Sequence, residues 1–254
     1  EMLCWPRNPA ERADAGVSHI DAAALDAQEA DRIRSKCIET GVSISALGYY
    51  PNMLHQDEGR AEAAVEHFKR VVDAAAVLGI GTANTFIGRP QYGSVEEGFA
   101  RFREVWPAIV RYAEKRNVRI GIENCPLYFT ADDWPGGGNL AFSPANWRRM
   151  FAEIPSEYFG LNYDPSHLVW QHMDPIRPLY EFREKLFHLH LKDAKLLPEA
   201  LNEVGILAPP LDYHIPKLPG LGDIDWGRFV SALTDIGYSG AACVEVEDSA
   251  FEGS

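Results

Sequence analysis

The order of strand-like and helix-like segments is the strongest constraint on how this chain can fold. Strand-like segments cover residues 1–4 (as the tail of a strand), 42–50, 82–87, 119–124, 159–164, 186–192 and 241–246. Between them, apolar residues at helical spacing mark residues 26–39, 60–78, 95–116, 144–154, 176–185 and 225–236, and loops are expected at 6–16, 126–140 and 194–223. This alternation predicts a parallel sheet with helices packed outside it.

The predicted fold is therefore α/β, a (β/α)₈ TIM barrel that forms a single domain over residues 1–254. We count seven strands where a barrel has eight, and we find no final helix. We thus expect a barrel without its first strand and helix and without its last helix, and both ends of the sequence look cut. An open doubly wound sheet is the alternative, and it is disfavoured because no Gly-x-Gly-x-x-Gly motif follows an early strand.

One strand carries an unusual polar face. In residues 187–193, Phe187, Leu189 and Leu191 point to one side, whereas His188, His190 and Lys192 point to the other, because successive side chains on a strand alternate. A face of two imidazoles and an amine predicts that this side of the strand lines a functional interior.

Three other strands end in acids. Glu123, Asp164 and Glu245 each lie on the face opposite the apolar residues of their strand, so we expect them to point into the barrel near its carboxyl end, where barrel active sites are built. With His190 they form a set of one imidazole and three carboxylates. That set predicts one divalent metal ion, with Mn²⁺ favoured and Mg²⁺, Co²⁺ or Zn²⁺ as alternatives.

Other side chains are candidates for contact with a substrate. His167 follows Asp164 by three residues, and the intervening Pro165 predicts a turn that folds His167 back over the site. Lys192 holds either a substrate oxygen or a carboxylate such as Glu245 or Glu247. The remaining candidates lie in loops after strands or in the long loop 194–223, and each also has a purely structural interpretation: Tyr50, His55, Arg89 and His214.

Four motifs, taken together, resemble a known family. They are Ile122-Glu123-Asn124, Asp164-Pro165-Ser166-His167, His190-Leu191-Lys192-Asp193 and Val244-Glu245. They resemble the xylose-isomerase-like TIM-barrel superfamily, which includes ketose 3-epimerases, inosose enzymes and, distantly, endonuclease IV. The chain is most similar to its sugar phosphate isomerase/epimerase branch, whose relatives include 3-keto-glycoside epimerases and deglycosidases. No phosphate cradle is evident, so an unphosphorylated sugar is expected.

The resemblance implies a site and a reaction. Glu123, Asp164, His190 and Glu245 would bind one divalent metal, Glu123 and Glu245 would also act as acid–base carboxylates, and His167 would touch a substrate oxygen. The implied activity is isomerisation or epimerisation of a sugar or keto-sugar through an enediolate. The alternatives are a lyase acting on 3-keto-glycosides at the same site, an endonuclease-IV-like DNA repair enzyme and a non-catalytic sugar-binding barrel.

The net charge and the composition limit the classes of partner that this protein is expected to bind. The net charge of −13 disfavours nucleic acid and anionic membrane surfaces as partners, since both attract Lys and Arg. The four cysteines are widely spaced and are expected to be reduced thiols in a cytoplasmic protein. No apolar run is long enough to span a membrane and no signal peptide is visible. The expected partner is a small-molecule sugar or keto-sugar, and assembly into a homo-oligomer is left open.

Overall fold

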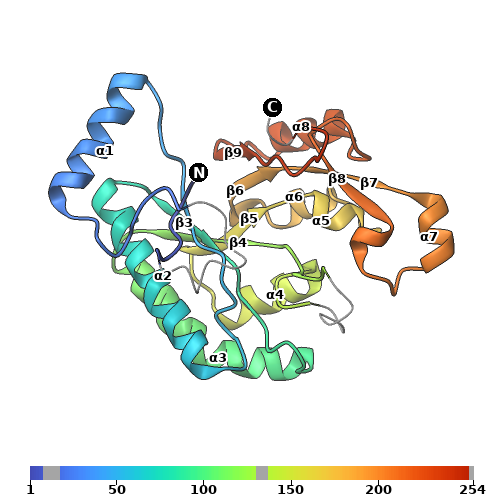
Figure 1. Cartoon of the computed structure of the whole chain (residues 1–254), viewed down its shortest axis with the longest axis horizontal. Coiled ribbons are helices and arrows are strands. Elements are labelled where there is room, and N and C mark those ends of the chain that lie inside the picture. The colour runs from blue at the N-terminus through green and yellow to red at the C-terminus, as the bar shows by residue number, and fades with distance from the viewer. Residues whose placement is uncertain (8–17, 130–136, 252–254) are drawn as a thin grey trace.

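The protein is built around one parallel sheet (Figure 1). The computed structural model describes residues 1–7, 18–129 and 137–251, so part of the predicted 6–16 and 126–140 loops lies outside the described residues. Within these ranges, seven strands pair in the order β1-β2-β3-β4-β5-β6-β9. Their bounds are β1 Met2–Leu3, β2 Leu47–Gly48, β3 Thr82–Thr85, β4 Arg119–Glu123, β5 Phe159–Tyr163, β6 Leu186–Leu191 and β9 Ala241–Val244.

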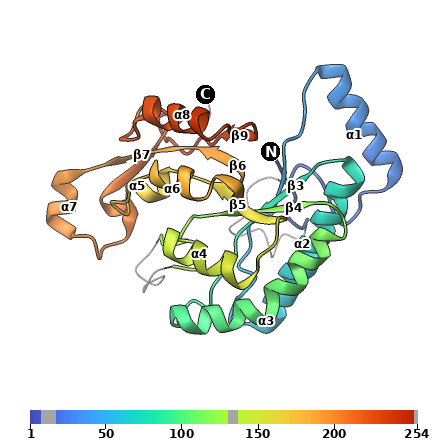
Figure 2. The ribbon, with the colours of Figure 1, turned by 180° about the vertical axis from the view of Figure 1, so that it is seen from behind.

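Helices connect successive strands, and most of them lie along the outside of the sheet, whereas the helices of residues 27–40 and 198–204 project away from it, as Figures 1 and 2 show from two sides. No helix in the described ranges is both long enough and apolar enough to cross a membrane. The seven strands and their helices confirm the prediction of a partial TIM barrel. The helix bounds are α1 Ala27–Thr40, α2 Glu58–Leu78, α3 Val95–Glu114, α4 Pro144–Glu153, α5 Ser166–Val169, α6 Arg177–Glu181, α7 Pro198–Val204 and α8 Trp226–Asp235.

The apolar faces of the strands pack against these helices. Ile120 and Ile122 of β4 and Leu161 of β5 are fully buried in the main hydrophobic core. Phe102 and Trp106 of α3 both pack against the ring of Phe159 at the start of β5, with ring centroids 6.2 and 5.6 Å away. Each large apolar side chain buried in this way contributes about 1.5–3 kcal/mol to folding. The acids on the opposite faces of the strands are thereby directed inwards.

Local signals set the helix ends. Asp57 precedes α2 and its side chain accepts a hydrogen bond from the backbone N of Arg60 at 2.9 Å. Ser94 and Glu97 form a reciprocal capping box at the start of α3. Gly79 ends α2 with φ +74°, a left-handed conformation that favours glycine.

The structure corrects several predicted boundaries. The strand predicted at 42–50 is reduced to two residues, because its neighbour β1 pairs only at Leu47 and Gly48. The helix predicted at 176–185 is α6 followed by a separate 3-10 turn, Arg183–Lys185. A short helix, α5, directly follows Asp164-Pro165, where no helix was predicted.

The predicted loop 194–223 is in fact largely ordered. It contains β7 (Asp193–Leu196), α7 and β8 (His214–Lys217), and the two strands pair as an antiparallel hairpin. Its strands are only four residues long and β8 contains Pro216, so the two-residue alternation typical of a strand is too short to stand out in the sequence. The hairpin extends from the carboxyl end of the sheet beside β6 (Figures 1 and 2).

β1 and β9 are the two edges of the sheet, and the described residues show no ladder between them. The two edges nevertheless approach each other, since the backbone N of Glu1 lies 3.3 Å from the Sγ of Cys243. Val244 of β9 is 59% exposed on the outer side of the sheet, where other strands are covered by helices. The arrangement is therefore a curved sheet whose edges are close but not hydrogen-bonded as strands.

The carboxylate of Asp193 binds the segment that leads from the hairpin into α8. This carboxylate is fully buried. It accepts hydrogen bonds from the backbone N of Gly220 at 3.0 Å, of Gly222 at 3.1 Å and of Ile224 at 3.1 Å, and from the indole Nε1 of Trp226 at 2.7 Å. The role that the sequence left open for this residue is thus a structural one.

We predict that Asp193→Asn destabilises the protein. The amide presents an NH₂ donor to one side of a cage built entirely from N–H donors, so two or more charge-assisted bonds are lost. The expected loss is about 3 kcal/mol in the free energy of unfolding and roughly 6–12 °C in Tm, measured by thermal denaturation. Asp223→Asn, which alters a single acceptor for the backbone N of Leu196 in the same segment, is the control and should lower Tm much less. Equal effects of the two changes would contradict the assignment.

Candidate active site

The four predicted metal ligands meet at the carboxyl ends of their strands. Glu123 ends β4, Asp164 directly follows β5, His190 lies in β6 and Glu245 directly follows β9. One ligand atom from each residue can be chosen so that all lie within 4.8 Å of one another. Glu123, Asp164 and His190 are buried, whereas the side chain of Glu245 is 30% exposed. The sequence alternation therefore placed all four on the correct face.

Several ligand-type atoms of the cluster lack a hydrogen-bond partner. Among the described residues these include Asp164 Oδ2, His190 Nδ1 and Glu245 Oε2, all buried. The other oxygen of Asp164, Oδ1, accepts a hydrogen bond from the backbone N of Ser166 at 2.8 Å. Buried polar atoms are normally hydrogen-bonded, whereas these atoms have only ion-pair contacts with one another and with Lys192 and His167.

The ring of His190 faces the carboxylates with one nitrogen. Its Nδ1 lies 3.7 Å from Glu123 Oε2 and 3.3 Å from Glu245 Oε2. Three carboxylates and one imidazole form a donor set that divalent ions of the Mg²⁺, Mn²⁺, Co²⁺ and Zn²⁺ group accept. The residues present therefore fit a divalent cation, which Glu123, Asp164, His190 and Glu245 would hold.

Lys192 supplies the positive charge nearest to the acids. Its Nζ lies 3.3 Å from Asp164 Oδ2, 3.1 Å from Glu245 Oε2 and 3.1 Å from Glu247 Oε2, and the residue is buried. Burial disfavours its charged form, but the surrounding carboxylates outweigh burial and raise the pKa of Lys192 well above its usual value. The side chain is thus an ammonium that joins three acids.

The surroundings shift the pKa values of the two glutamates in opposite directions. Burial raises the pKa of Glu123, and the charge of Glu245 adds to this shift. Burial also acts on Glu245, but Lys192 and His190 hold the pKa of its carboxyl well below its usual range. In the metal-free protein the surroundings therefore push the pKa values of the two carboxyls in opposite directions.

Asparagines fix the strand ends that carry the acids. Asn124 donates from Nδ2 to the carbonyl of Asp164 at 2.9 Å, and its Oδ1 accepts from the backbone N of Asp164 at 2.8 Å. Asn139 donates to the carbonyls of Glu123 at 3.0 Å and Cys125 at 2.7 Å. Both asparagines are fully buried. The positions of Glu123 and Asp164 are therefore set by backbone contacts as well as by the sheet.

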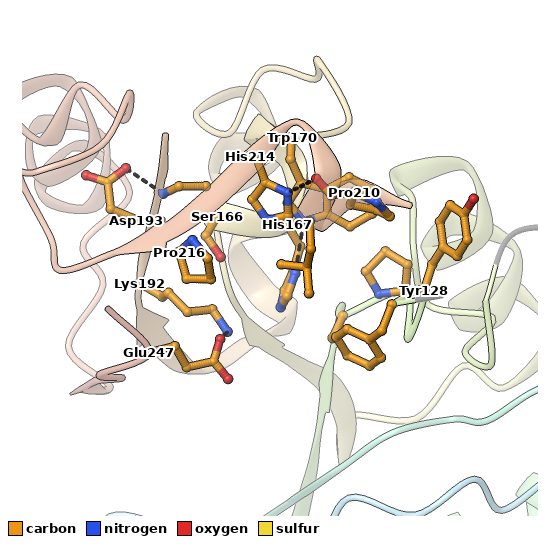
Figure 3. Close-up of a pocket in the computed structure, with 15 residues that line it drawn as sticks. Tyr128, Ser166, His167, Trp170, Lys192, Asp193, Pro210, His214, Pro216 and Glu247 are labelled. Carbon is orange, nitrogen blue, oxygen red and sulfur yellow. Dashed lines mark hydrogen bonds and ion pairs between the residues drawn. The ribbon is translucent and has the colours of Figure 1, made fainter. Parts of the chain in front are cut away.

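A pocket adjoins the cluster on the side of the β7–β8 hairpin (Figure 3). His167 and Lys192 belong to both: His167 Nε2 lies 3.2 Å from Asp164 Oδ2 and 3.5 Å from Glu123 Oε1. Figure 3 shows Lys192 and Glu247 together on one side, Tyr128 on the other and His167 between them. Most of the remaining wall is apolar or aromatic, from Tyr128, Phe129, Trp170, Pro210, Leu211 and Pro216.

Two other residues that the sequence predicted as substrate contacts, His214 and Tyr50, lie near the pocket or the four-residue cluster. His214 lines the pocket, stacks on Trp170 with ring centroids 5.6 Å apart and donates from Nδ1 to the carbonyl of Pro210 at 2.6 Å. Burial lowers the pKa of His214 to about 4, so it is neutral at pH 7 and Nδ1 is the donor in that bond. Tyr50 lies beside the cluster, with its ring 6.2 Å from that of His190.

His55 and Arg89 have local structural contacts instead. The Nδ1 of His55 accepts a hydrogen bond from the backbone N of Asp57, just before α2. Arg89 is 2% exposed and donates from Nη2 to the carbonyl of Gly93 at 2.6 Å. Substrate contact by either residue stays a prediction.

Sequence reasoning missed three residues at the site. Glu1 and Asn162 both contact the Nε2 of His190, and Cys125 groups with Glu123 and His167. The alternation that placed Asp164 also places Asn162 on the inner face, so this signal was present. β1 is two residues long and follows Glu1, so no comparable pattern could have assigned Glu1.

Comparisons with known proteins agree with this architecture. A family model described as "Xylose isomerase-like TIM barrel" matches residues 6–253. The chain superposes on the solved 3-keto-D-glucoside 4-epimerase YcjR from E. coli with a TM-score of 0.67 and 15% identity, covering 88% of this chain and 81% of that one. At this identity the likeness shows a shared fold.

Two curated relatives align over shorter stretches. The uncharacterized protein YfiH of Bacillus subtilis (strain 168) is 29% identical over 153 residues, which cover 56% of this chain and 45% of that protein. The inosose dehydratase of Geobacillus thermodenitrificans (strain NG80-2) is 30% identical over 103 residues, covering 39% of this chain and 34% of that enzyme. The chain thus matches less than half of the length of these relatives.

We predict that the purified protein binds one divalent cation per chain at the cluster. Asp164→Asn removes one charged ligand and should weaken Mn²⁺ binding by at least about 10-fold, measured by isothermal titration calorimetry. Asp31→Asn, on the exposed face of α1, is the matched control and should leave the affinity unchanged. Metal analysis that found about three zinc ions per chain would instead favour an endonuclease-IV-like site.

Proposed function

Because this chain belongs to the xylose isomerase-like TIM-barrel family, we propose that it is a divalent-metal-dependent isomerase or epimerase that acts on a sugar or keto-sugar. One observation carries the proposal: three carboxylates and an imidazole meet at the carboxyl end of the barrel, with one ligand atom of each within 4.8 Å of the others. The fold shared with a 3-keto-D-glucoside 4-epimerase supports a sugar as the substrate.

Glu123 and Glu245 are the acid–base groups of the proposed reaction. They are carried by β4 and β9, which β5 and β6 separate in the sheet, so the two carboxylates approach the site from different directions. One carboxylate removes the proton from a carbon next to a carbonyl, and the other returns a proton to the opposite face, which inverts that carbon. If a single carboxylate removes the proton and delivers it to the neighbouring former carbonyl carbon, the carbonyl moves to the carbon that lost its proton, and the product is the aldose–ketose isomer instead.

The remaining residues hold the substrate and its charge. A divalent cation at the cluster would supply Lewis-acid stabilisation for the negative charge that develops on the substrate oxygens. Lys192 and His167 lie at the boundary between the cluster and the pocket, so they can bind the sugar hydroxyls that flank the reacting carbon. Burial of both side chains strengthens these interactions by excluding water.

A lyase that acts on 3-keto-glycosides is the second candidate. The pocket favours it, because its apolar wall beside Lys192 and Glu247 is suited to a leaving group without charge. The 30% identity to an inosose dehydratase, an enzyme named for an elimination, points the same way. In this reaction a carboxylate removes the proton at C2, next to the carbonyl, and the C1–O bond to the aglycone breaks. The aglycone takes up a proton and leaves as an alcohol.

We predict that Glu123→Gln and Glu245→Gln each lower kcat by about 10²–10⁴-fold, since the amide cannot accept the proton. A substrate panel of keto-sugars should be assayed in D₂O, with deuterium incorporation at carbon followed by NMR. Glu62→Gln, an exposed position on α2, controls for the loss of one negative charge. Full turnover and full deuterium exchange in both active-site variants would show that the acid–base assignment is wrong.

Product analysis separates the two candidate reactions. With a 3-keto-glycoside as substrate in D₂O, an epimerase gives a single diastereomer of the same composition, heavier than the substrate only by the one deuterium that it carries. A lyase releases the free aglycone together with an unsaturated or hydrated keto-sugar. We expect the epimer as the main product, measured by mass spectrometry and NMR, and release of an aglycone as the main product would favour the lyase.

A further inference from the structure

The imidazole of His190 has different partners on its two nitrogens. Nδ1 faces the carboxylates of the cluster and has no hydrogen-bond partner. Nε2 lies 2.6 Å from Glu1 Oε2 and 3.0 Å from Asn162 Nδ2. The side chain of Glu1 is 9% exposed, so this contact is shielded from water. The ring is therefore held from behind by a residue that lies outside the four-residue cluster.

The direction of the hydrogen bonds can be assigned from the chemistry of the partners. The hydroxyl of Tyr50 donates to Glu1 Oε1 at 2.5 Å, so both oxygens of this carboxylate are engaged as acceptors. An ionised carboxylate only accepts, and Nε2 of His190 must then carry the proton of the bond to Oε2. The side-chain Nδ2 of Asn162 donates a hydrogen bond to the hydroxyl oxygen of Tyr50 at 3.2 Å.

The hydrogen bonds deeper in the barrel can be assigned donors and acceptors in the same way. Asn162 Oδ1 accepts from His188 Nδ1 at 2.9 Å, and the Nε2 of His188 can accept from the hydroxyl of Ser45 at 3.1 Å. His188 is 1% exposed, and because the amide oxygen of Asn162 only accepts, Nδ1 of His188 carries the proton of that bond. Along the path from Ser45 through His188, Asn162 and Tyr50 to Glu1, each bond then has one donor and one acceptor, and Glu1 is where the network ends. Asn162 Nδ2 and Nε2 of His190, 3.0 Å apart, are both donors in this assignment, so their contact is not a hydrogen bond.

We propose that Glu1 is a positioning residue: by accepting the Nε2 proton of His190 it fixes the tautomer whose Nδ1 lone pair points at the metal cluster. The inference rests on the proposed metal site but not on the identity of the sugar or of the reaction. A carboxylate behind a histidine ligand fixes the orientation of the ring and raises its basicity. Without it the imidazole can protonate at either nitrogen, and the Nδ1–H form cannot bind a cation through Nδ1.

The test measures the tautomer and the metal affinity separately. The carboxylates around His190 raise its pKa, so the metal-free protein is brought to a pH high enough for the ring to carry a single proton. There, ¹H–¹⁵N correlation of the histidine side chains should show Nε2 of His190 protonated and Nδ1 bare. Glu1→Ala should give a mixture of both tautomers and weaken Mn²⁺ binding by about 10- to 100-fold. Glu1→Gln, of the same size, keeps one acceptor oxygen and should fall between the wild type and Glu1→Ala. Glu62→Gln should change neither readout.

A third variant keeps the proposal testable if the Glu1 variants do not fold. Tyr50→Phe leaves the carboxylate on His190 but removes the second bond to Glu1, so the tautomer should persist while the affinity falls less than in Glu1→Ala. Unchanged tautomer and unchanged affinity in both Glu1 variants would overturn the proposal. If metal binding and tautomer respond as expected but no keto-sugar is turned over, the role of Glu1 stands and the proposed function fails.

Discussion

Repulsion between buried acids is the constraint on which this site depends. Glu123, Asp164 and Glu245 bring three carboxylates within a few ångströms of one another. Two like charges about 4 Å apart repel by about 4 kcal/mol at the effective dielectric of a protein surface. Lys192 offsets part of this through its contacts with Asp164 and Glu245, and protonation of His190 or Glu123 offsets more. A divalent cation between the acids would remove the need for either protonation.

The sheet holds the three carboxylates close together despite their mutual repulsion. Glu123 and Asp164 stand at the ends of strands whose other faces are buried in the core, so these two acids cannot turn away without exposing apolar residues. Hydrogen bonds from Asn124 and Asn139 then fix the strand ends themselves. The β7–β8 hairpin, anchored through the carboxylate of Asp193, adds one wall of the pocket next to Lys192. Rigid supports and an open side facing a pocket are what a proton-transfer site needs.

The parts of the fold that could be predicted share one property: their signal is local. Alternation along β4 and β6 assigned Glu123 and His190 to the inner face, because a strand has only two faces and the apolar one is taken by the core. The β7–β8 hairpin was missed because its pairing joins Asp193 to Lys217 across a helix and a turn. Its short strands gain stability from Asp193 and its neighbours, and no local pattern encodes that contact.

By itself the sequence determined the partial barrel, the four cluster residues and the inner position of His188, since periodicity and strand order are carried by neighbouring residues. Only the tertiary structure decided which nitrogen of His190 faces the cluster. That choice depends on Glu1, 189 positions away in the chain, and on Asn162, which lies on the adjacent strand. The proton of an imidazole is assigned by whichever acceptor lies within hydrogen-bond reach, and only folding brings that acceptor there.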